Sequence, residues 1–126
     1  MEANPTLTTV TLGTPDPVGL ARFYAALLGW PEPDVPDGED WLALRNPEGG
    51  VGLAFQGEPT HLPPVWPQDA YHQQMQFHLE IRVDDLAAGV ARAVACGARV
   101  ADFQPQEDVR VCLDPAGHPF CLWIEA

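Results

Sequence analysis

The sequence predicts an α+β fold made of two copies of one strand–helix–strand unit. The first observation is a repeated turn, because residues 46–50 (NPEGG) and 114–118 (DPAGH) lie 68 positions apart and an apolar run follows each. The second is that residues 8–12 and 77–81 are extended-looking runs, each followed by an aspartate and a helical pattern. A long period that occurs twice indicates two copies of a supersecondary unit. Two paired units form a cleft between them, where a small molecule could bind.

The first copy, about residues 6–56, has clear helix boundaries. Asp16 is a favourable N-cap, and Pro17 suits the first helical position because that position needs no amide donor. Apolar residues follow at helical spacing, and Gly29 closes the helix. The NPEGG turn predicts a hairpin after a loop rich in proline and aspartate. The strands predicted for this copy are residues 6–12, 41–45 and 51–56.

The second copy, about residues 75–126, repeats this order after a proline-rich connector, about residues 57–74. Asp84 or Asp85 caps the predicted helix, and Gly97 ends it. A second hairpin surrounds the DPAGH turn. The strands predicted for this copy are residues 75–83, 99–103, 109–113 and 119–125. With 126 residues in all, the two copies and the connector are expected to form one domain.

Alternation in the first strand of each copy predicts which side chains face the helix. In residues 77–83 every odd position is apolar and every even position is polar, so the two sets point to opposite faces of the sheet. We therefore expect Phe77, Leu79, Ile81 and Val83 to pack under the helix, with Val10 and Leu12 as their counterparts in the first copy. The remaining faces should line a shared groove. The expected lining is Thr9, Thr11, Leu53, Phe55, His78, Glu80, Cys121 and Trp123.

The composition excludes some classes of partner. The formal net charge is -12, from 18 acidic side chains against 6 arginines, and the chain has no lysine. Nucleic acid and anionic membrane surfaces carry phosphate and would be repelled. The charge therefore either serves solubility or attracts a cationic ligand.

Cysteine usage and the N-terminus indicate a cytoplasmic protein. Cys96, Cys112 and Cys121 are odd in number and lack short C-x-x-C spacing, which is typical of reduced thiols rather than of a disulfide framework. The first residues have neither the basic start nor the apolar run of a signal peptide. No stretch has the apolar length of a membrane span.

Several segments spread over nearly the whole chain carry a family resemblance. They are residues 16–17 (DP), 23–30 (FYAALLGW), 78–80 (HLE), 97–98 (GA) and 114–122 (DPAGHPFCL). With these segments the chain resembles the glyoxalase, bleomycin-resistance and extradiol-dioxygenase superfamily, also called vicinal oxygen chelate proteins, and in particular its glyoxalase-like domain group. The resemblance implies paired βαβββ modules that form a curved mixed sheet around a cavity. It also implies a homodimer.

Metal-dependent members of this superfamily hold a divalent ion with one residue from the first strand and one from the last strand of each module. Carried over to this chain, the positions fall on Thr9 and about Leu53 in the first module, and on His78 and Cys121 in the second. Threonine is a weak ligand and leucine is none, whereas a catalytic site needs about three protein ligands. We therefore expect no cofactor. The alternative is a divalent metal held by His78 and Glu80.

His78 and Glu80 form the best polar pair in the sequence. Two residues apart on a strand, they share a face and can both reach one ligand. The functional interpretation is a binding or acid–base pair, with a Glu80 pKa raised by burial and a histidine tuned by a neighbouring charge. The structural interpretation is a hydrogen-bonded pair, or a salt bridge from Glu80 to Arg82 or Arg110. The sequence leaves both open.

Cys121 and the tryptophans have structural explanations as well as functional ones. Cys121 could be a thiolate ligand or a nucleophile, but no neighbouring cation is evident beyond His78, and a small apolar filler is the simpler interpretation. Trp66 lies within the proline-rich connector, so we expect it to contact a ligand or a second subunit. The other tryptophans are expected mostly in the core.

Three functions remain compatible with the sequence. The first is a binding module that sequesters a small, partly aromatic or cationic molecule without metal catalysis. The second is a lyase, isomerase or dioxygenase of the superfamily that uses a metal site at His78 and Glu80. The third is a domain without a small-molecule role, such as a dimeric regulatory partner. Fold identity does not choose among them, because function depends on the site.

Overall fold

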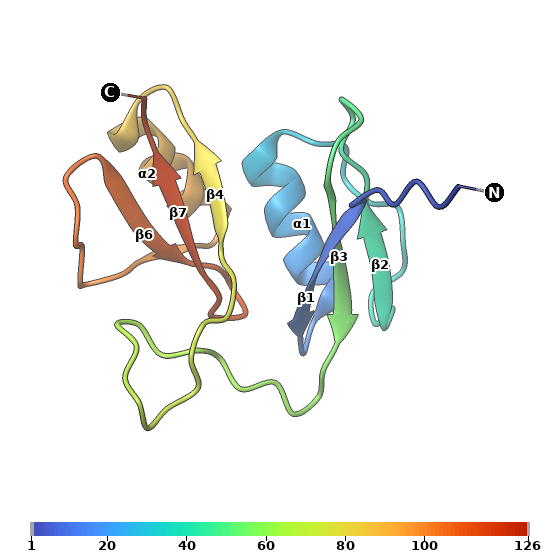
Figure 1. Ribbon diagram of the computed structural model, residues 1–126, viewed down its shortest axis with the longest axis horizontal. Coiled ribbons are helices and arrows are strands. Elements are labelled where there is room, and N and C mark those ends of the chain that lie inside the picture. Colours follow the sequence, from blue (N-terminus) through green and yellow to red (C-terminus); the bar gives the residue numbers. More distant parts are fainter. Residues whose placement is uncertain (1, 126) are drawn as a thin grey trace. The chain divides into compact units, whose positions relative to one another are not determined.

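The computed structural model describes residues 2–125, which divide into two compact units at Pro59 and Thr60. Each unit is a small mixed sheet with one helix (Figure 1). The order of elements confirms the predicted α+β class and the duplicated strand–helix–strand plan. Neither helix, with 12 and 11 residues, combines the length and hydrophobicity that crossing a membrane requires.

The first unit contains β1 (Thr9–Thr14), α1 (Pro17–Leu28), β2 (Trp41–Leu44) and β3 (Gly52–Gly57). The strand order is β1-β3-β2, with β1 parallel and β2 antiparallel to the central β3. The parallel pairing of β1 with β3 requires a crossover, which α1 provides. The first strand begins three residues later than the sequence analysis predicts.

The sequence sets both ends of α1. The Asp16 side chain accepts a hydrogen bond from the Gly19 amide at 3.1 Å, and Pro17 occupies the first turn. Gly29 ends the helix with φ at 71°, a left-handed conformation that glycine adopts without strain. The Tyr24 ring stacks on Phe55 of β3 at a centroid distance of 6.0 Å. This contact shows which face of the sheet α1 covers.

Residues 29–40 form a loop in the first unit, where the second unit has an additional strand. Arg22 of α1 holds this loop through ion pairs with Asp37 at 2.9 Å and with Glu32 at 3.5 Å. Prolines at 31, 33 and 36 each remove a backbone donor, which disfavours a paired strand. The first unit is therefore βαββ over the described residues, one strand short of the βαβββ plan.

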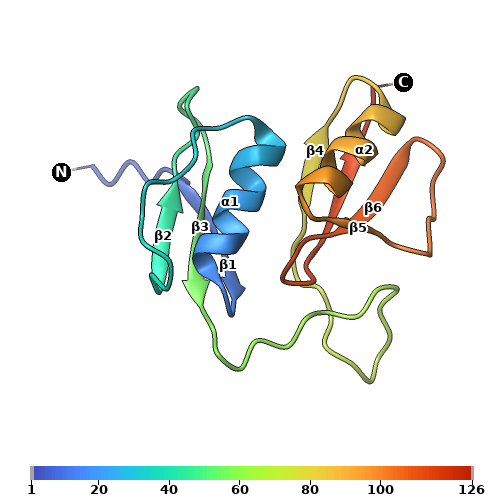
Figure 2. The ribbon, with the colours of Figure 1, turned by 180° about the vertical axis from the view of Figure 1, so that it is seen from behind.

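The second unit contains β4 (Leu79–Arg82), α2 (Leu86–Cys96), β5 (Arg99–Val100), β6 (Val109–Leu113) and β7 (Pro119–Trp123). The strand order is β4-β7-β6-β5, with β4 parallel to β7 and the other pairs antiparallel. This is the complete βαβββ arrangement. Viewed from behind, α2 lies on one side of this sheet (Figure 2).

The ends of α2 are also those that the sequence predicts. Of the two candidate caps, Asp85 is the one used, because its side chain accepts a hydrogen bond from the Ala87 amide at 3.0 Å. Gly97 ends the helix with φ at 123°. Gly89 lies close to Val83, since a Cβ at Gly89 would come within 2.9 Å of the valine methyl groups. Residue 89 therefore stays small so that the helix can approach the chain next to β4.

The predicted position of Phe77 is wrong. Its side chain is 89% exposed and lies outside β4, which begins at Leu79. The pairing of β4 with β7 starts at Leu79 and Phe120, and the preceding Pro119 has no N–H to continue the ladder. Without a paired strand, alternation in residues 77 and 78 does not place Phe77 under the helix.

The predicted faces of Leu53 and Phe55 are also wrong. Both side chains are buried on the α1 side, where Leu53 pairs with Val10 and Phe55 with Leu12. The cause is a turn that is one residue longer in the first copy. β3 begins at Gly52, six positions after Asn46, whereas β7 begins five positions after its aspartate. A shift of one residue in a strand moves every side chain to the other face.

The connector belongs in large part to the second unit. Within residues 60–74, the Nε2 atom of His61 lies 2.8 Å from the Ala116 carbonyl oxygen in the β6–β7 turn. The Trp66 indole donates a hydrogen bond to the Phe103 carbonyl oxygen at 3.1 Å, and the two rings lie 6.1 Å apart. These contacts attach the loop to the β6–β7 turn and to the segment between β5 and β6.

Candidate functional site

The second unit brings a histidine and a carboxylate together at the start of β4. His78 immediately precedes the strand, and Glu80 is its second residue. The Nε2 atom of His78 lies 2.5 Å from Oε2 of Glu80. Their side chains keep 36% and 50% of their surface exposed, so the pair is accessible to a solute. The contact agrees with the prediction from the sequence that the two side chains can reach one ligand.

Cys121 of β7 completes this cluster. It is the direct partner of Glu80 in the parallel pairing of β4 and β7, so both side chains point away from α2. One ligand atom from each of His78, Glu80 and Cys121 lies within 4.8 Å of the others. The thiol is partly buried, next to Val111 on the neighbouring strand. We call these three residues the HEC cluster.

The environment of Cys121 keeps its thiol protonated. Burial, the negative charge of Glu80 and a hydrogen bond to Glu80 together raise the pKa of Cys121 to about 12. A thiol is nucleophilic only as the thiolate. At neutral pH Cys121 therefore acts as a hydrogen-bond donor to Glu80 and not as a nucleophile.

Trp123 and Arg82 extend the same face of the sheet. They are direct partners in β4 and β7, two residues beyond Glu80 and Cys121. Arg82 forms an exposed ion pair with Glu125 at 3.1 Å, which leaves the Glu80 carboxylate to its histidine and thiol partners. Trp123 is partly exposed and offers a flat apolar ring beside the HEC cluster.

The remaining predicted site residues lie elsewhere. Thr9 and Thr11 are exposed on the sheet of the first unit, on the face opposite to α1 as predicted. Leu53 and Phe55 belong to the core of that unit. Trp66, in the connector, packs on Phe103 in the segment between β5 and β6. The structure thus groups only part of the expected groove lining on one face.

The corrected faces change the donor positions that the family resemblance implies. The strand pairing makes Ala54, and not Leu53, the counterpart of Cys121. Ala54 pairs with Thr11 in the first unit, and Cys121 pairs with Glu80 in the second. At the positions of the HEC cluster the first unit therefore has the exposed Thr9 and Thr11 and the fully buried Ala54. A donor set shared between two modules does not fit these residues, since neither a hydroxyl nor a methyl group is a good ligand.

The HEC cluster itself fits a metal ion by chemistry. Imidazole, carboxylate and thiolate are the three ligand types that zinc proteins use, and three protein ligands leave a position open. Among residues 2–125, no other group of three such side chains is close enough to hold an ion. The sequence places His78, Glu80 and Cys121 on one expected groove lining and names Cys121 as a possible thiolate ligand, but it pairs only His78 with Glu80 as the alternative metal site. The register of β4 against β7 adds that Cys121 is the direct partner of Glu80.

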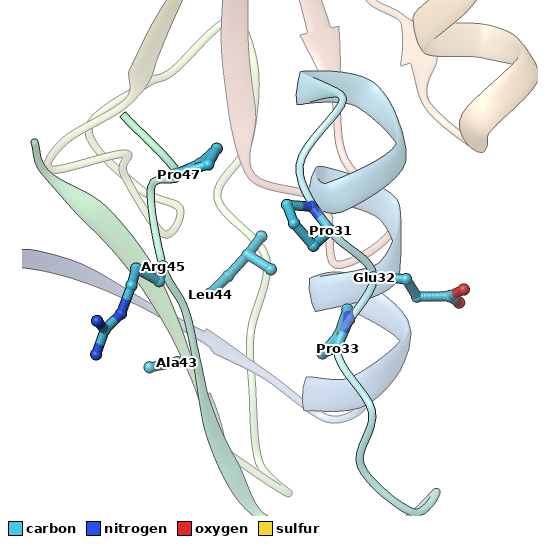
Figure 3. Close-up of a pocket in the computed structure, with 7 residues that line it drawn as sticks. All are labelled: Pro31, Glu32, Pro33, Ala43, Leu44, Arg45 and Pro47. Carbon is cyan, nitrogen blue, oxygen red and sulfur yellow. The ribbon is translucent and has the colours of Figure 1, made fainter. Parts of the chain in front are cut away.

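A separate pocket of about 290 Å³ lies in the first unit, between the loop after α1 and the edge strand β2. It is lined by Pro31, Glu32, Pro33, Ala43, Leu44, Arg45 and Pro47. The charged ends of Glu32 and Arg45 point to opposite sides, away from the apolar floor (Figure 3). The pocket therefore lacks a polar group aimed inward that would fix the orientation of a ligand.

Solved structures of other proteins share this fold. A glyoxalase/bleomycin resistance protein/dioxygenase family enzyme from Burkholderia phytofirmans is 19% identical, with a TM-score of 0.68 over 95% of this chain and 98% of its own. A glyoxalase/bleomycin resistance protein from Albidiferax ferrireducens is 18% identical, with a TM-score of 0.64 over the same shares. TnmS3, an antibiotic binding protein from a Streptomyces species, is 19% identical, with a TM-score of 0.62 over the full length of both chains.

Sequence comparison identifies the family. No curated protein is a significant sequence match to the chain. The profile of the family described as "Glyoxalase-like domain" matches residues 9–123, from the start of β1 to the end of β7. The match therefore spans both units and the connector. The chain belongs to the glyoxalase-like domain family, within the vicinal oxygen chelate superfamily.

Proposed function

We propose that this protein binds and sequesters a small organic molecule on the open face of the second sheet. The observation that carries this proposal is the grouping of Glu80, His78 and Trp123 on one accessible face of β4 and β7. A few polar groups beside an aromatic surface are typical of small-molecule sites. The proposed function needs no metal and no covalent step.

The chemistry of this face favours a ligand that is flat and cationic. The Glu80 carboxylate supplies a negative charge, and the Trp123 ring supplies a surface for stacking or for a cation–π contact. The net charge of -12 draws cations toward the protein in general. The structural neighbour TnmS3, which is described as an antibiotic binding protein, supports the idea that this fold can serve as a binder.

Tryptophan fluorescence tests the proposal. Metal-free protein, kept in EDTA, is titrated with bleomycin and with a panel of planar cationic antibiotics. We expect saturable quenching that Trp123→Phe largely removes, and affinity that falls at least tenfold in Glu80→Gln because a charged hydrogen bond contributes about 1.5–3 kcal/mol. Trp41→Phe is the matched control, since Trp41 is 53% exposed on the first unit.

Two outcomes would contradict this function. One is the absence of saturable quenching by every compound in the panel. The other is binding that survives unchanged in both Glu80→Gln and Trp123→Phe. The variants Thr9→Ala and Thr11→Ala test whether the first sheet also contributes to ligand binding, because both hydroxyls are exposed on its open face.

The second candidate function is a metal-dependent lyase, isomerase or dioxygenase that uses His78 and Glu80. The HEC cluster favours it, because a bound divalent ion would polarise a carbonyl or enol oxygen of a substrate. In that case Glu80 would be placed to accept or return a proton at the carboxylate oxygen that faces His78. Turnover of a superfamily substrate that Glu80→Gln abolishes would support the enzyme. Equal turnover in wild type and Glu80→Gln would exclude this role.

We also propose that the protein works as a homodimer in the reducing cytoplasm. The family supports dimerisation, and the free thiols of Cys96, Cys112 and Cys121 support a reducing environment. Light scattering after size exclusion would give the mass of the particle. A monomer at micromolar concentration would contradict the first statement.

A further inference from the structure

We propose that the first unit binds an extended segment of a partner protein, with alternating basic and apolar side chains, as an additional strand beside β2. The surface consists of β2 and the loop at residues 29–40, and we call it the β2 edge. It belongs to the other unit from the HEC cluster, so it does not depend on the proposed function. The chemistry of the partner follows from the backbone, the pocket and the charges of this surface.

The backbone of β2 has hydrogen-bonding groups without a strand partner. β2 is an outer strand of its sheet, and the Gly57 amide of β3 donates a hydrogen bond to the Asp40 carbonyl oxygen at 2.7 Å. Because successive residues of an antiparallel strand alternate in direction, Trp41 and Ala43 direct their N–H and C=O groups away from β3. Within the described part of the chain, no backbone hydrogen bond reaches these outward groups. They are therefore available to an added strand.

The second unit shows what occupies the equivalent position there. Its β5 pairs with β6, and β6 is the counterpart of β2 because both are antiparallel to the strand that follows them. In the first unit the loop lies there instead, and Pro31 and Pro33 have no N–H to offer. A pocket of about 290 Å³ separates these prolines from β2 (Figure 3). The fold therefore has a strand position at this edge that the chain itself leaves unpaired.

The pocket selects an apolar side chain at every second position of the added strand. Its lining includes Pro31, Pro33, Leu44 and Pro47, and Leu44 is buried. Side chains of a strand alternate between the two faces of a sheet, so alternate residues of the partner segment lie on the same face as Leu44. These residues meet apolar walls. Specificity for the main chain comes from the outward backbone groups, since no charged side chain points into the pocket (Figure 3).

The charges of the loop favour a basic partner. Residues 29–40 contain five acidic side chains and no basic one. Arg22 of α1 pairs with two of the five, whereas Asp34 and Glu39 are exposed and have no ion-pair partner among the described residues. Lysine or arginine side chains of the partner segment would complement them. A second copy of the chain would bring another acidic loop to the same edge and be repelled.

Fluorescence anisotropy with labelled peptides tests the β2 edge. Short peptides that alternate lysine with valine or leucine are titrated with the whole protein. We expect saturable binding that weakens as salt is added, because exposed charges are screened. Peptides that alternate glutamate with the same apolar residues are the charge control and should not bind.

A proline substitution tests the role of the outward backbone. Proline is tolerated in an edge strand where its nitrogen faces solvent, so Ala43→Pro should fold while losing the outward donor. We expect peptide affinity to fall about tenfold. Ala43→Thr is the matched control, because it keeps the amide at an exposed position and should bind as wild type does. Circular dichroism confirms that each variant is folded.

Two further measurements separate the backbone from the charges. Bound peptide should slow hydrogen exchange of the Ala43 amide, which is free in the unbound protein. The double variant Asp34→Asn with Glu39→Gln should weaken binding and reduce its salt dependence. Glu107→Gln with Asp108→Asn makes the same change of net charge in the second unit, on exposed side chains, and should leave the affinity unchanged.

Four results would overturn the inference. They are the absence of saturable binding by the lysine peptides, equally tight binding of the glutamate peptides, and undiminished binding by folded Ala43→Pro. The fourth is a dimer that Ala43→Pro dissociates in light scattering, which would assign the β2 edge to a second copy. None of them bears on quenching of Trp123 in the second unit, so failure of this surface and failure of the proposed function are distinguishable.

Discussion

The two units have the same plan but different content. Each has a parallel pair of strands joined by a helix, with an antiparallel hairpin after it, and each helix begins at an aspartate and ends at a glycine. The first unit replaces one strand with the loop at residues 29–40. The second keeps all four strands and carries the polar cluster. The comparison teaches that a duplicated backbone does not duplicate a site.

The difference is sharpest at equivalent positions of the sheets. Thr9 and Thr11, which are exposed, and Ala54, which is buried, occupy the positions where the second sheet has the HEC cluster. Equivalent positions thus carry two hydroxyls and a methyl group in one unit and three metal-binding groups in the other. The difference at these positions lies in the side chains, because the pairing of Thr11 with Ala54 is equivalent to that of Glu80 with Cys121.

The helices also differ in the size of the side chains that they bury. In α1 the buried residues include the large rings of Phe23 and Tyr24, whose centroids lie 4.8 Å apart. In α2 the buried residues are Gly89 and Ala93. Large aromatic rings remove far more apolar surface from water than these small residues do. We therefore expect α1 to be held by packing and α2 to depend more on its caps.

The largest expected effect comes from the two core phenylalanines. Phe55 and Phe120 are both fully buried, one under each helix. Phe55→Ala and Phe120→Ala should each lower the free energy of unfolding by about 3–5 kcal/mol. Urea unfolding followed by circular dichroism measures this. Phe77→Ala is the control, since an 89% exposed ring should cost within about 0.5 kcal/mol. A small loss for Phe55→Ala would contradict its place in the core.

The second test makes the open face of the second unit like that of the first. The triple variant His78→Thr, Glu80→Thr and Cys121→Ala should bind Zn²⁺ at least a hundredfold more weakly, a loss of about 2.7 kcal/mol. The fold should persist because none of the three side chains is fully buried. Calorimetry gives the affinity and thermal unfolding reports the fold. Unchanged affinity in a folded variant would place the ion outside the HEC cluster.

The third test uses alkaline pH, to which the cysteines make the second unit sensitive. Burial raises the pKa of Cys112 to about 11 from its usual 9.0, and the pKa of Cys121 is raised to about 12. Between pH 9 and 11 the unfolded chain loses thiol protons that the folded chain keeps, so stability falls as pH rises.

Cys112→Ala isolates one thiol in this pH range. It should remove up to about 2 kcal/mol of the decrease in unfolding free energy between pH 9 and 11, because one pKa unit corresponds to about 1.4 kcal/mol. Urea unfolding at pH 8, 9, 10 and 11 measures the slope for wild type and variant. Parallel slopes would mean that the folded chain does not hold the Cys112 proton more tightly than the unfolded chain.

The smallest expected effect concerns the two helix caps. Asp16→Ala and Asp85→Ala each remove the acceptor for an amide near the helix start, at 3.1 Å and 3.0 Å. Each should cost about 1 kcal/mol of global stability. Amide hydrogen exchange should distinguish the two variants. Asp85→Ala should increase the opening of α2 more than Asp16→Ala increases the opening of α1. Equal effects on the two helices would weaken the distinction between packing and capping.

Local signals in the sequence predicted most of the backbone. Asp16, Pro17 and Gly29 set the ends of α1, and Gly97 sets the end of α2, because caps act through hydrogen bonds and φ angles within a few residues. Both hairpins were predictable from their turns. The two-residue spacing of His78 and Glu80 also predicted that they can reach one ligand, and the two side chains are in contact.

Tertiary structure alone decided which side chains meet across the strands. A turn one residue longer in the first copy moved Leu53 and Phe55 into the core, and a 68-residue offset read along the chain could not show that shift. The pairing of Glu80 with Cys121 joins residues far apart in the sequence, so no local pattern records it. Caps and turns depend on neighbouring residues. The register between strands depends instead on the burial of whole faces of the sheet, because a shift of one residue moves every side chain of the strand to the other face.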